Sequence, residues 1–187
     1  MQSQKKFPAT FSFELFPPQT PEGIEKLRVA RSQLAQFNPK FFSVTYGAGG
    51  STRDRTIETV LEIQAEGRTV APHLSCIGST RENIYALLKK YQDNGIHHLV
   101  ALRGDLPSGM AQAGEFRYAN ELVTFIRQEF GNLFRIEIAA YPEYHPQARS
   151  AQDDFKNFIK KIEAGADSAI TQYFYNAEAY FHFIDMC

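Results

Sequence analysis

The chain has 187 residues, 43% of them hydrophobic and 22% charged, with a formal net charge of -1. This near-neutral globular composition gives no electrostatic reason to expect nucleic acid or an anionic membrane as a partner. The apolar runs are too short to cross a bilayer and the N-terminus has no apolar signal segment, so we expect neither a membrane nor a secretory protein. Two cysteines without metal or disulfide spacing predict a reducing, cytoplasmic location.

Six apolar runs typical of β-strands recur at intervals of roughly 30 residues. In chain order they read FSFELFPP, FFSVTYGAGG, VAPHLSC, HLVALRGD, RIEIAAYPEYH and AITQYFY. Amphipathic helix patterns lie between them, and Thr20, Ser79 and Ser150 are the predicted N-caps of three of these helices. A last helix is expected at residues 177–186.

This alternation of strands and helices predicts parallel strands joined by right-handed crossovers, in one domain of residues 1–187. It is typical of the α/β class and of the (β/α)8 TIM barrel, which needs eight strands and about 250 residues. About six of the eight βα units are present, so we expect a barrel that is incomplete at its C-terminal side. An open doubly wound sheet shares the pattern, but no G-x-G-x-x-G follows the first strand, where Pro17 and Pro18 stand instead.

Most of the strand-like runs end in a polar side chain that could do chemistry. In a (β/α) barrel the C-terminal strand ends meet at one mouth, so residues far apart in the sequence become neighbours in space. The pattern therefore indicates an enzyme. The residues at these ends are Glu14, Thr45, His73, Arg103, Asp105, Tyr141, His145 and Gln172.

Several of these signals also have a purely structural interpretation. Glu14 is either a partly buried acid with a raised pKa or an exposed carboxylate on an edge strand, paired to an arginine. The sequence Arg103-Gly104-Asp105 is either part of a site or a local turn with an ion pair. The glycine-rich stretch at residues 47–51 suggests a phosphate cradle, but no lysine follows it, so we favour a flexible active-site loop.

The histidines and lysines allow further alternatives. A lone histidine is more often a structural hydrogen-bonding group than a catalyst, and none here has metal-ligand spacing. His98 begins the fourth strand, at the opposite end of a barrel, and is given no chemical role. No lysine stands convincingly near a strand end, which argues against a Schiff-base aldolase. The spacing of the polar residues on the predicted fifth helix describes a solvated face, formed by Asp154, Asn157, Lys160 and Lys161.

Taken together, the segments FSFELFPP, SVTYGAGGSTRDRT, APHLSCI, VALRGD, AAYPEYHP and AITQYFY resemble the methylenetetrahydrofolate reductase family, in order and in spacing. The resemblance covers nearly the whole chain, from Phe11 to Phe183. It implies a (β/α)8 barrel that binds FAD and reduces 5,10-methylenetetrahydrofolate to 5-methyltetrahydrofolate in one-carbon and methionine metabolism. It also implies NADH or NADPH as the hydride source, small folate and nicotinamide molecules as partners, and often a homo-oligomer.

The resemblance implies roles for individual residues as well. Glu14 matches the general acid that helps to open the bridged folate, a task that requires a neutral carboxylic acid. Asp105 matches an aspartate near the flavin and the pterin ring, and Thr45 and Gln172 match folate contacts. The FAD-binding set of the family matches His73, Leu102, Arg103, Gly104, Asp105, Tyr118, Ala119, Tyr141, His145, Asp154, Asn157, Lys160 and Lys161.

Members of the family carry further substrate contacts on strands seven and eight, which this sequence does not reach. We therefore expect the chain alone to bind flavin weakly and to turn over poorly. The main alternative is a catalytically incompetent fragment or pseudoenzyme that acts through protein association, because an unpaired sixth strand invites pairing with another chain. An unrelated barrel enzyme, such as an aldolase or a sugar-phosphate isomerase, is the third interpretation.

Overall fold

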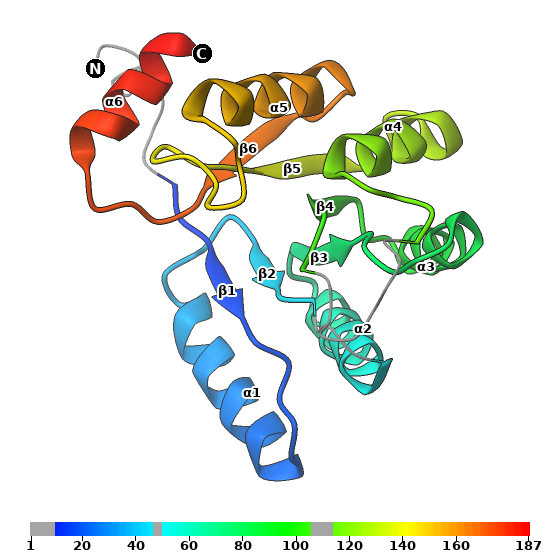
Figure 1. Cartoon of the computed structure of the whole chain (residues 1–187). Coiled ribbons are helices and arrows are strands. Elements are labelled where there is room, and N and C mark those ends of the chain that lie inside the picture. The colour runs from blue at the N-terminus through cyan, green and yellow to red at the C-terminus, as the bar shows by residue number, and fades with distance from the viewer. Residues whose placement is uncertain (1–9, 47–49, 106–113) are drawn as a thin grey trace.

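The computed structural model describes residues 10–46, 50–105 and 114–187, with the backbone alone at residues 50–53. Strands and helices alternate along the chain, as predicted (Figure 1). The strands are β1 (Phe13–Leu15), β2 (Phe42–Val44), β3 (Val70–Ser75), β4 (His98–Leu102), β5 (Arg135–Ala140) and β6 (Ser168–Thr171). The helices are α1 (Pro21–Ala35), α2 (Gly50–Ala65), α3 (Arg81–Asp93), α4 (Ala119–Phe130), α5 (Ala151–Glu163) and α6 (Ala177–Met186).

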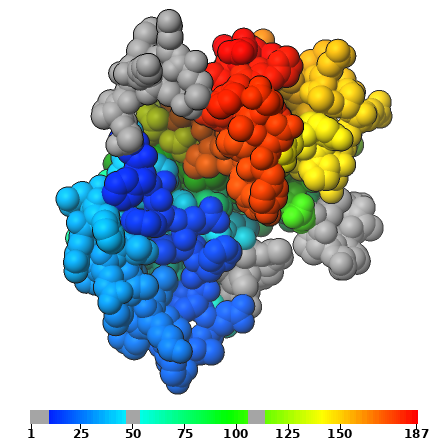
Figure 2. Space-filling view, turned by 90° about the vertical axis from the view of Figure 1, so that its left-hand side faces the viewer, coloured from blue at the N-terminus to red at the C-terminus, as the bar shows by residue number. Residues whose placement is uncertain are grey.

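The strands form one parallel sheet, in which each strand pairs with the next along the chain. The sheet curls into an open half-barrel with helices around its outer side (Figure 1). Within the described residues, β1 and β6 each have one strand neighbour, so both are edges. Figure 2 shows the first elements, in blue, and the last helix, in red, on the same face. The sequential strand order excludes the doubly wound alternative, whose order reverses at a switch point.

Side-chain hydroxyls start the helices at two of the three predicted positions. The Oγ atoms of Thr20 and Ser150 each accept a hydrogen bond from the backbone N–H three residues on, at 3.1 Å. The prediction for α3 was wrong by one residue, since Thr80 and not Ser79 caps it, with an Oγ1–N distance of 3.2 Å. The N–H of Ser79 donates to the carbonyl of Cys76 at 3.1 Å, which keeps Ser79 in the turn after β3.

The hydrophobic core lies between the outer face of the sheet and the helices. Leu99 of β4 and Ile136 of β5 are fully buried members of it, and each such side chain stabilises the fold by about 1.5–3 kcal/mol. Side chains alternate along a strand, so the remaining positions face the concave side. His73, Val100 and Glu137 stand opposite one another on β3, β4 and β5 and therefore share that inner face.

A buried histidine–carboxylate pair lies on the inner face of β4 and β5. The Nε2 atom of His98 lies 2.9 Å from Oε1 of Glu137, and Nε of Arg135 lies 3.2 Å from the same oxygen. Burial raises the pKa of Glu137, but hydrogen bonds led by the one from His98 outweigh it and hold the pKa at about 2. His98 therefore has a structural contact, at the end of the sheet where the sequence predicted no chemistry.

Helix α1 is attached to α2 by ion pairs. The guanidinium of Arg31 is 2% exposed and contacts the carboxylates of Glu62 and Glu66. Arg28 also pairs with Glu62, at 2.9 Å. A buried guanidinium is tolerated only where carboxylates compensate its charge, and here two carboxylates do so.

Candidate functional site

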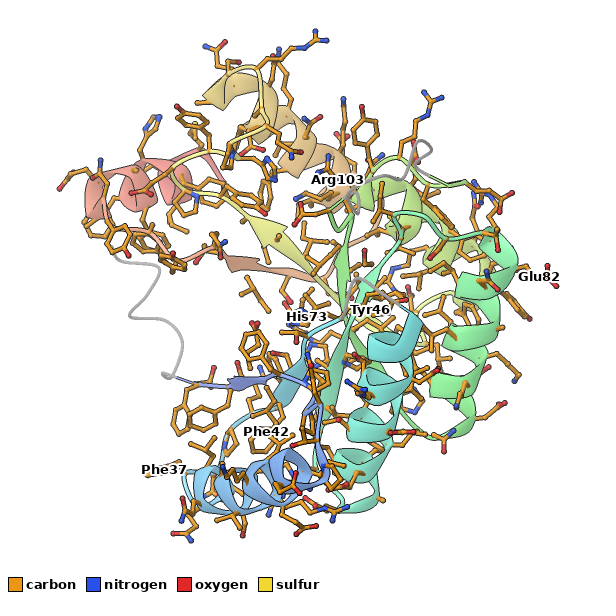
Figure 3. All side chains as sticks on the ribbon, turned by 60° about the horizontal axis from the view of Figure 1, so that its bottom comes forward. Phe37, Phe42, Tyr46, His73, Glu82 and Arg103 are labelled. Atoms are coloured by element: carbon orange, nitrogen blue, oxygen red, sulfur yellow. The ribbon has the colours of Figure 1, made fainter. Side chains whose placement is uncertain are left out.

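A cavity of about 500 Å³ lies at the C-terminal ends of β4 and β5, between the first turn of α4 and one side of α5. We call it the β4–β5 cavity. Barrels of this class place their sites at this end of the sheet. Figure 3 shows Arg103 beyond the end of β4, near α5. The predicted residues that line the cavity are Leu102, Arg103, Gly104, Asp105, Tyr118, Ala119, Tyr141, His145, Asp154, Asn157, Lys160 and Lys161.

The turn after β4 brings the backbone unusually close to β3. Gly104 has φ +83°, and a Cβ placed there would lie 1.9 Å from Oγ of Ser75. That hydroxyl donates to the carbonyl of Arg103 at 2.9 Å, so the two strand ends are tied together. Only glycine fits this close approach without strain, which explains the Gly in the Arg103-Gly104-Asp105 sequence.

Arg103 makes no ion pair with any described residue, so the alternative of a turn closed by an ion pair is wrong. Its Nε donates to the carbonyl of Gly104 at 3.1 Å, and its Nη2 donates to Oε1 of Gln147 at 2.7 Å. Asp105 is exposed and lines the same cavity. The positive charge of Arg103 therefore stays available beside the cavity.

The loop from β5 to α5 forms the next wall and is held by its own hydrogen bonds. The backbone N–H of His145 donates to Oδ2 of Asp154 at 3.0 Å, which fixes the loop to the first turn of α5. The imidazole of His145 packs edge-on against the ring of Tyr141, with the ring centres 4.6 Å apart. Burial, with smaller contributions from the charges of Asp154 and Asp105, raises the pKa of Tyr141, so this phenol stays protonated at neutral pH.

Helix α5 presents amide and ammonium groups to the cavity. Asn157 and Lys160 are exposed, as the solvated-face interpretation predicts. Lys161 is different, because its ammonium is largely buried and donates to the carbonyl of Ala139 on β5. Burial lowers the pKa of this amine, against the opposing charge of Asp154. The prediction that no lysine lies near a strand end is therefore wrong, since the residue reaches β5 from a helix.

Four predicted site residues are not among those that line the β4–β5 cavity. Thr45 directly follows β2, and Gln172 directly follows β6 and is exposed. Glu14 is 52% exposed and lies 4.0 Å from Nε2 of His73, measured from Oε2. Burial lowers the pKa of His73 to about 4, so its imidazole is neutral at pH 7. Glu14 is thus the exposed carboxylate of an edge strand, and its neighbour is a histidine instead of the expected arginine.

Sequence reasoning missed five residues of the cavity wall: Ala101, Asn120, Ala139, Gln147 and Ala148. Asn120 directly follows Ala119, and Gln147 stands two positions after His145, so proximity to predicted residues was the available signal. The glycine-rich prediction at residues 47–51 falls largely on residues 47–49, which lie outside the described part of the chain.

The described residues contain neither a metal-type cluster nor a membrane-spanning helix. No group of His, Cys, Asp or Glu side chains among them has the arrangement of a metal site. None of their helices is long and apolar enough to span a membrane.

A sequence model of the family described as methylenetetrahydrofolate reductase matches residues 1–187. The 5,10-methylenetetrahydrofolate reductase of Escherichia coli is 45% identical over 177 residues, which are 94% of this chain and 58% of that protein. Methylenetetrahydrofolate reductase (NADH) 1 of Arabidopsis thaliana is 38% identical over 191 residues, covering 95% of this chain and 32% of its own. The chain thus spans little more than half the length of the bacterial relatives that it matches.

A solved structure from Clostridium thermocellum has a similar fold. It is a protein described as binding two copies of 5-methyl-5,6,7,8-tetrahydrofolic acid, and it aligns with a TM-score of 0.67 at 17% identity. The alignment covers 98% of this chain and 61% of that one. The predicted barrel fold, with part of its βα units present, is confirmed. On the family match and on this bacterial identity, the chain belongs to the methylenetetrahydrofolate reductase family.

Proposed function

We propose that this chain carries the flavin site of an FAD-dependent reductase that converts 5,10-methylenetetrahydrofolate to 5-methyltetrahydrofolate with NADH or NADPH. Family membership supports the reaction, and the name of the Arabidopsis relative favours NADH. The single observation that carries the proposal is the β4–β5 cavity, which gathers nearly the whole predicted FAD-binding set from four distant segments.

The chemistry of the cavity wall suits a flavin dinucleotide. Arg103 on one side and Lys160 and Lys161 on the other supply cations for a pyrophosphate. Gly104 has no side chain, so a flat ring system can approach the backbone there. Asn157 and His145 supply neutral hydrogen-bonding groups for hydroxyls. The donor set therefore fits FAD better than it fits a metal ion or a simple phosphate.

Bound FAD would supply the redox chemistry, taking hydride from the nicotinamide and giving it to the folate. We assign to this chain the tasks of binding, orientation and proton transfer. Asp105, exposed at the cavity, is proposed to tune the flavin and to contact the pterin, while Thr45 and Gln172 are proposed folate contacts.

Glu14 is the proposed general acid, which protonates the nitrogen that leaves when the bridged folate opens. Its carboxyl lies beside His73, which is neutral because burial lowers its pKa to about 4. Since Glu14 is half exposed, a substrate at the barrel mouth can reach its carboxyl.

The proposal extends to the domain organisation, cellular location and oligomeric state of the protein. We propose that residues 1–187 belong to one (β/α) barrel catalytic domain that acts in the cytoplasm in methionine biosynthesis, in agreement with its free cysteines, buried Cys76 and exposed Cys187. A homo-oligomer remains part of the proposal by analogy with the family.

A second candidate is a role in protein association, and the exposed edge of the sheet favours it. Ile170 on β6 is 40% exposed, and the tyrosines at positions 173 and 175 are 73% and 89% exposed. Open strand edges flanked by apolar side chains are sites where another chain can pair. The aldolase alternative has Lys161 in its favour, but the family match outweighs a single buried amine.

The test is a visible absorption spectrum of the purified chain with FAD, before and after anaerobic NADH or NADPH. Flavin bands that co-elute with the protein and bleach on reduction would support the proposal. Flavin that separates completely from the protein, together with a defined complex on size-exclusion chromatography, would favour association instead.

A further inference from the structure

Gln147 joins two walls of the β4–β5 cavity. Its side-chain Oε1 accepts a hydrogen bond from Nη2 of Arg103 at 2.7 Å, across a sequence separation of 44 residues. Its backbone N–H donates to Nδ1 of His145 at 3.0 Å. One residue therefore contacts the turn after β4 through its side chain and the β5–α5 loop through its backbone.

The loop that carries Gln147 is itself fixed. The backbone N–H of His145 donates to Asp154 at the start of α5, and the N–H of Ala148 donates to the carbonyl of His145 at 2.9 Å. The position of Gln147 is thus set by α5.

The guanidinium of Arg103 depends on Gln147 for its direction. Its backbone is held, since its carbonyl accepts hydrogen bonds from the hydroxyl of Ser75 and the N–H of Ile77. The Nε atom of Arg103 donates to the adjacent carbonyl of Gly104. At the far end of the side chain, Nη2 donates to Oε1 of Gln147. Without that acceptor, the flexible arginine would lose much of its fixed orientation.

We propose that Gln147 is a positioning residue, which holds the Arg103 guanidinium at the cavity for the phosphate groups of a bound flavin nucleotide. This inference rests on the proposed flavin site. Gln147 would act through Arg103, so removing its acceptor should weaken binding of phosphate-bearing flavins and leave riboflavin unaffected. A glutamate at position 147 retains an oxygen acceptor and should preserve the orientation of Arg103.

The first experiment needs no flavin. Arginine side-chain NMR of the full chain reports the order of the Arg103 Nε–H group. Gln147→Leu should lower its heteronuclear NOE, whereas Gln147→Glu and the control Gln128→Leu, an exposed position on α4, should retain the wild-type value. An unchanged Arg103 signal in folded Gln147→Leu protein would overturn the inference, whatever the flavin results.

The second experiment measures equilibrium binding of FAD, FMN and riboflavin. Gln147→Leu should weaken FAD and FMN binding by about fivefold, riboflavin should not change, and the loss should vanish in an Arg103→Leu background. An equal loss for riboflavin, or an additive loss in the double variant, would contradict the inference. Failure of the wild-type chain to bind any flavin would instead remove the proposed function, and the NMR result would then decide the positioning role alone.

Discussion

The two sides of the open half-barrel differ in how completely each one encloses a site. On the β4–β5 side, consecutive strands, the turn of Gly104 and the loop of His145 are tied together around a formed cavity. On the β1 side, Glu14 lies on a three-residue edge strand and is half exposed. Adjacent βα units suffice to build a cofactor-type site, but a site that lies across a barrel also needs strands on its other side.

Two carboxylate–histidine pairs, one on each side, differ in burial and distance in the same way. Glu137 and His98 are buried and 2.9 Å apart, within a network that includes Arg135. Glu14 and His73 are 4.0 Å apart, and the carboxylate is half exposed. The first pair is buried and structural, while the second leaves a carboxyl that a substrate can reach.

The largest expected effect tests the β1 side. Glu14→Gln should slow folate reduction on the order of 10²–10⁴-fold in FAD-loaded protein and leave reduction of the flavin by nicotinamide nearly intact, because only the former needs a general acid. Stopped-flow spectroscopy separates the two half-reactions. Glu82→Gln is the matched control, since Glu82 points outward from α3 (Figure 3). Equal losses in both half-reactions would remove Glu14 from the acid role.

The next effect tests how tightly the β4–β5 side is built. Gly104→Ala should destabilise the chain by about 2–4 kcal/mol in urea unfolding, since the new Cβ would clash with Ser75 at an unfavourable φ. Gly67→Ala shares the positive φ, +73°, but meets nothing within 4 Å, so it should cost only about 1–2 kcal/mol. If the two alanine variants were equally stable, the close approach of β3 and β4 would carry no energetic weight.

The buried pair should show in the pH dependence of stability. The folded-state pKa of Glu137 is about 2, below its ordinary value of 4.5, so its contribution is complete above pH 4.5 and is lost as the pH falls toward 2. Because each unit between the two pKa values corresponds to about 1.4 kcal/mol, we expect on the order of 3 kcal/mol from this group. Urea unfolding at stepped pH should give a flatter profile for Glu137→Gln than for wild type. Parallel profiles would show that the pair does not hold its charge in the folded state.

The smallest expected effect concerns the cations of the cavity. Lys161→Met should weaken FAD binding about fivefold, while stability should change by less than about 1 kcal/mol because a costly buried ammonium is removed. Lys156→Met, an exposed position on the same helix, should leave FAD affinity unchanged. Isothermal titration calorimetry measures both. A similar loss in the two variants would indicate general electrostatic attraction instead of a specific contact.

Most of the fold was predictable because each βα unit repeats the same local signals. Apolar runs located the strands, and hydroxyl residues located the helix starts at Thr20 and Ser150. The start of α3 was missed because Ser79 and Thr80 can both cap a helix, and the turn after β3 decides between them. That choice depends on tertiary hydrogen bonds, which local patterns do not encode.

The strand-end pattern alone found four residues of the candidate site, Arg103, Asp105, Tyr141 and His145, and the resemblance supplied the rest of the predicted set, including the residues of α5. Helical spacing described Lys161 as solvated, yet the carbonyl of Ala139 and the packing around β5 bury its ammonium. For Glu14 the sequence left burial and exposure both open, and the edge position of β1 exposes it. In both cases, the neighbours in space decide the exposure, and those neighbours lie far away in the sequence.

The uninterrupted strand order has a consequence for synthesis on the ribosome. Each strand from β2 to β6 finds its partner in the strand made just before it, so the sheet can lengthen one unit at a time as the chain emerges. Among these six strands, none depends on a pairing partner that is made much later. The residues that line the β4–β5 cavity end at Lys161, so all of them have been made before β6 is synthesised.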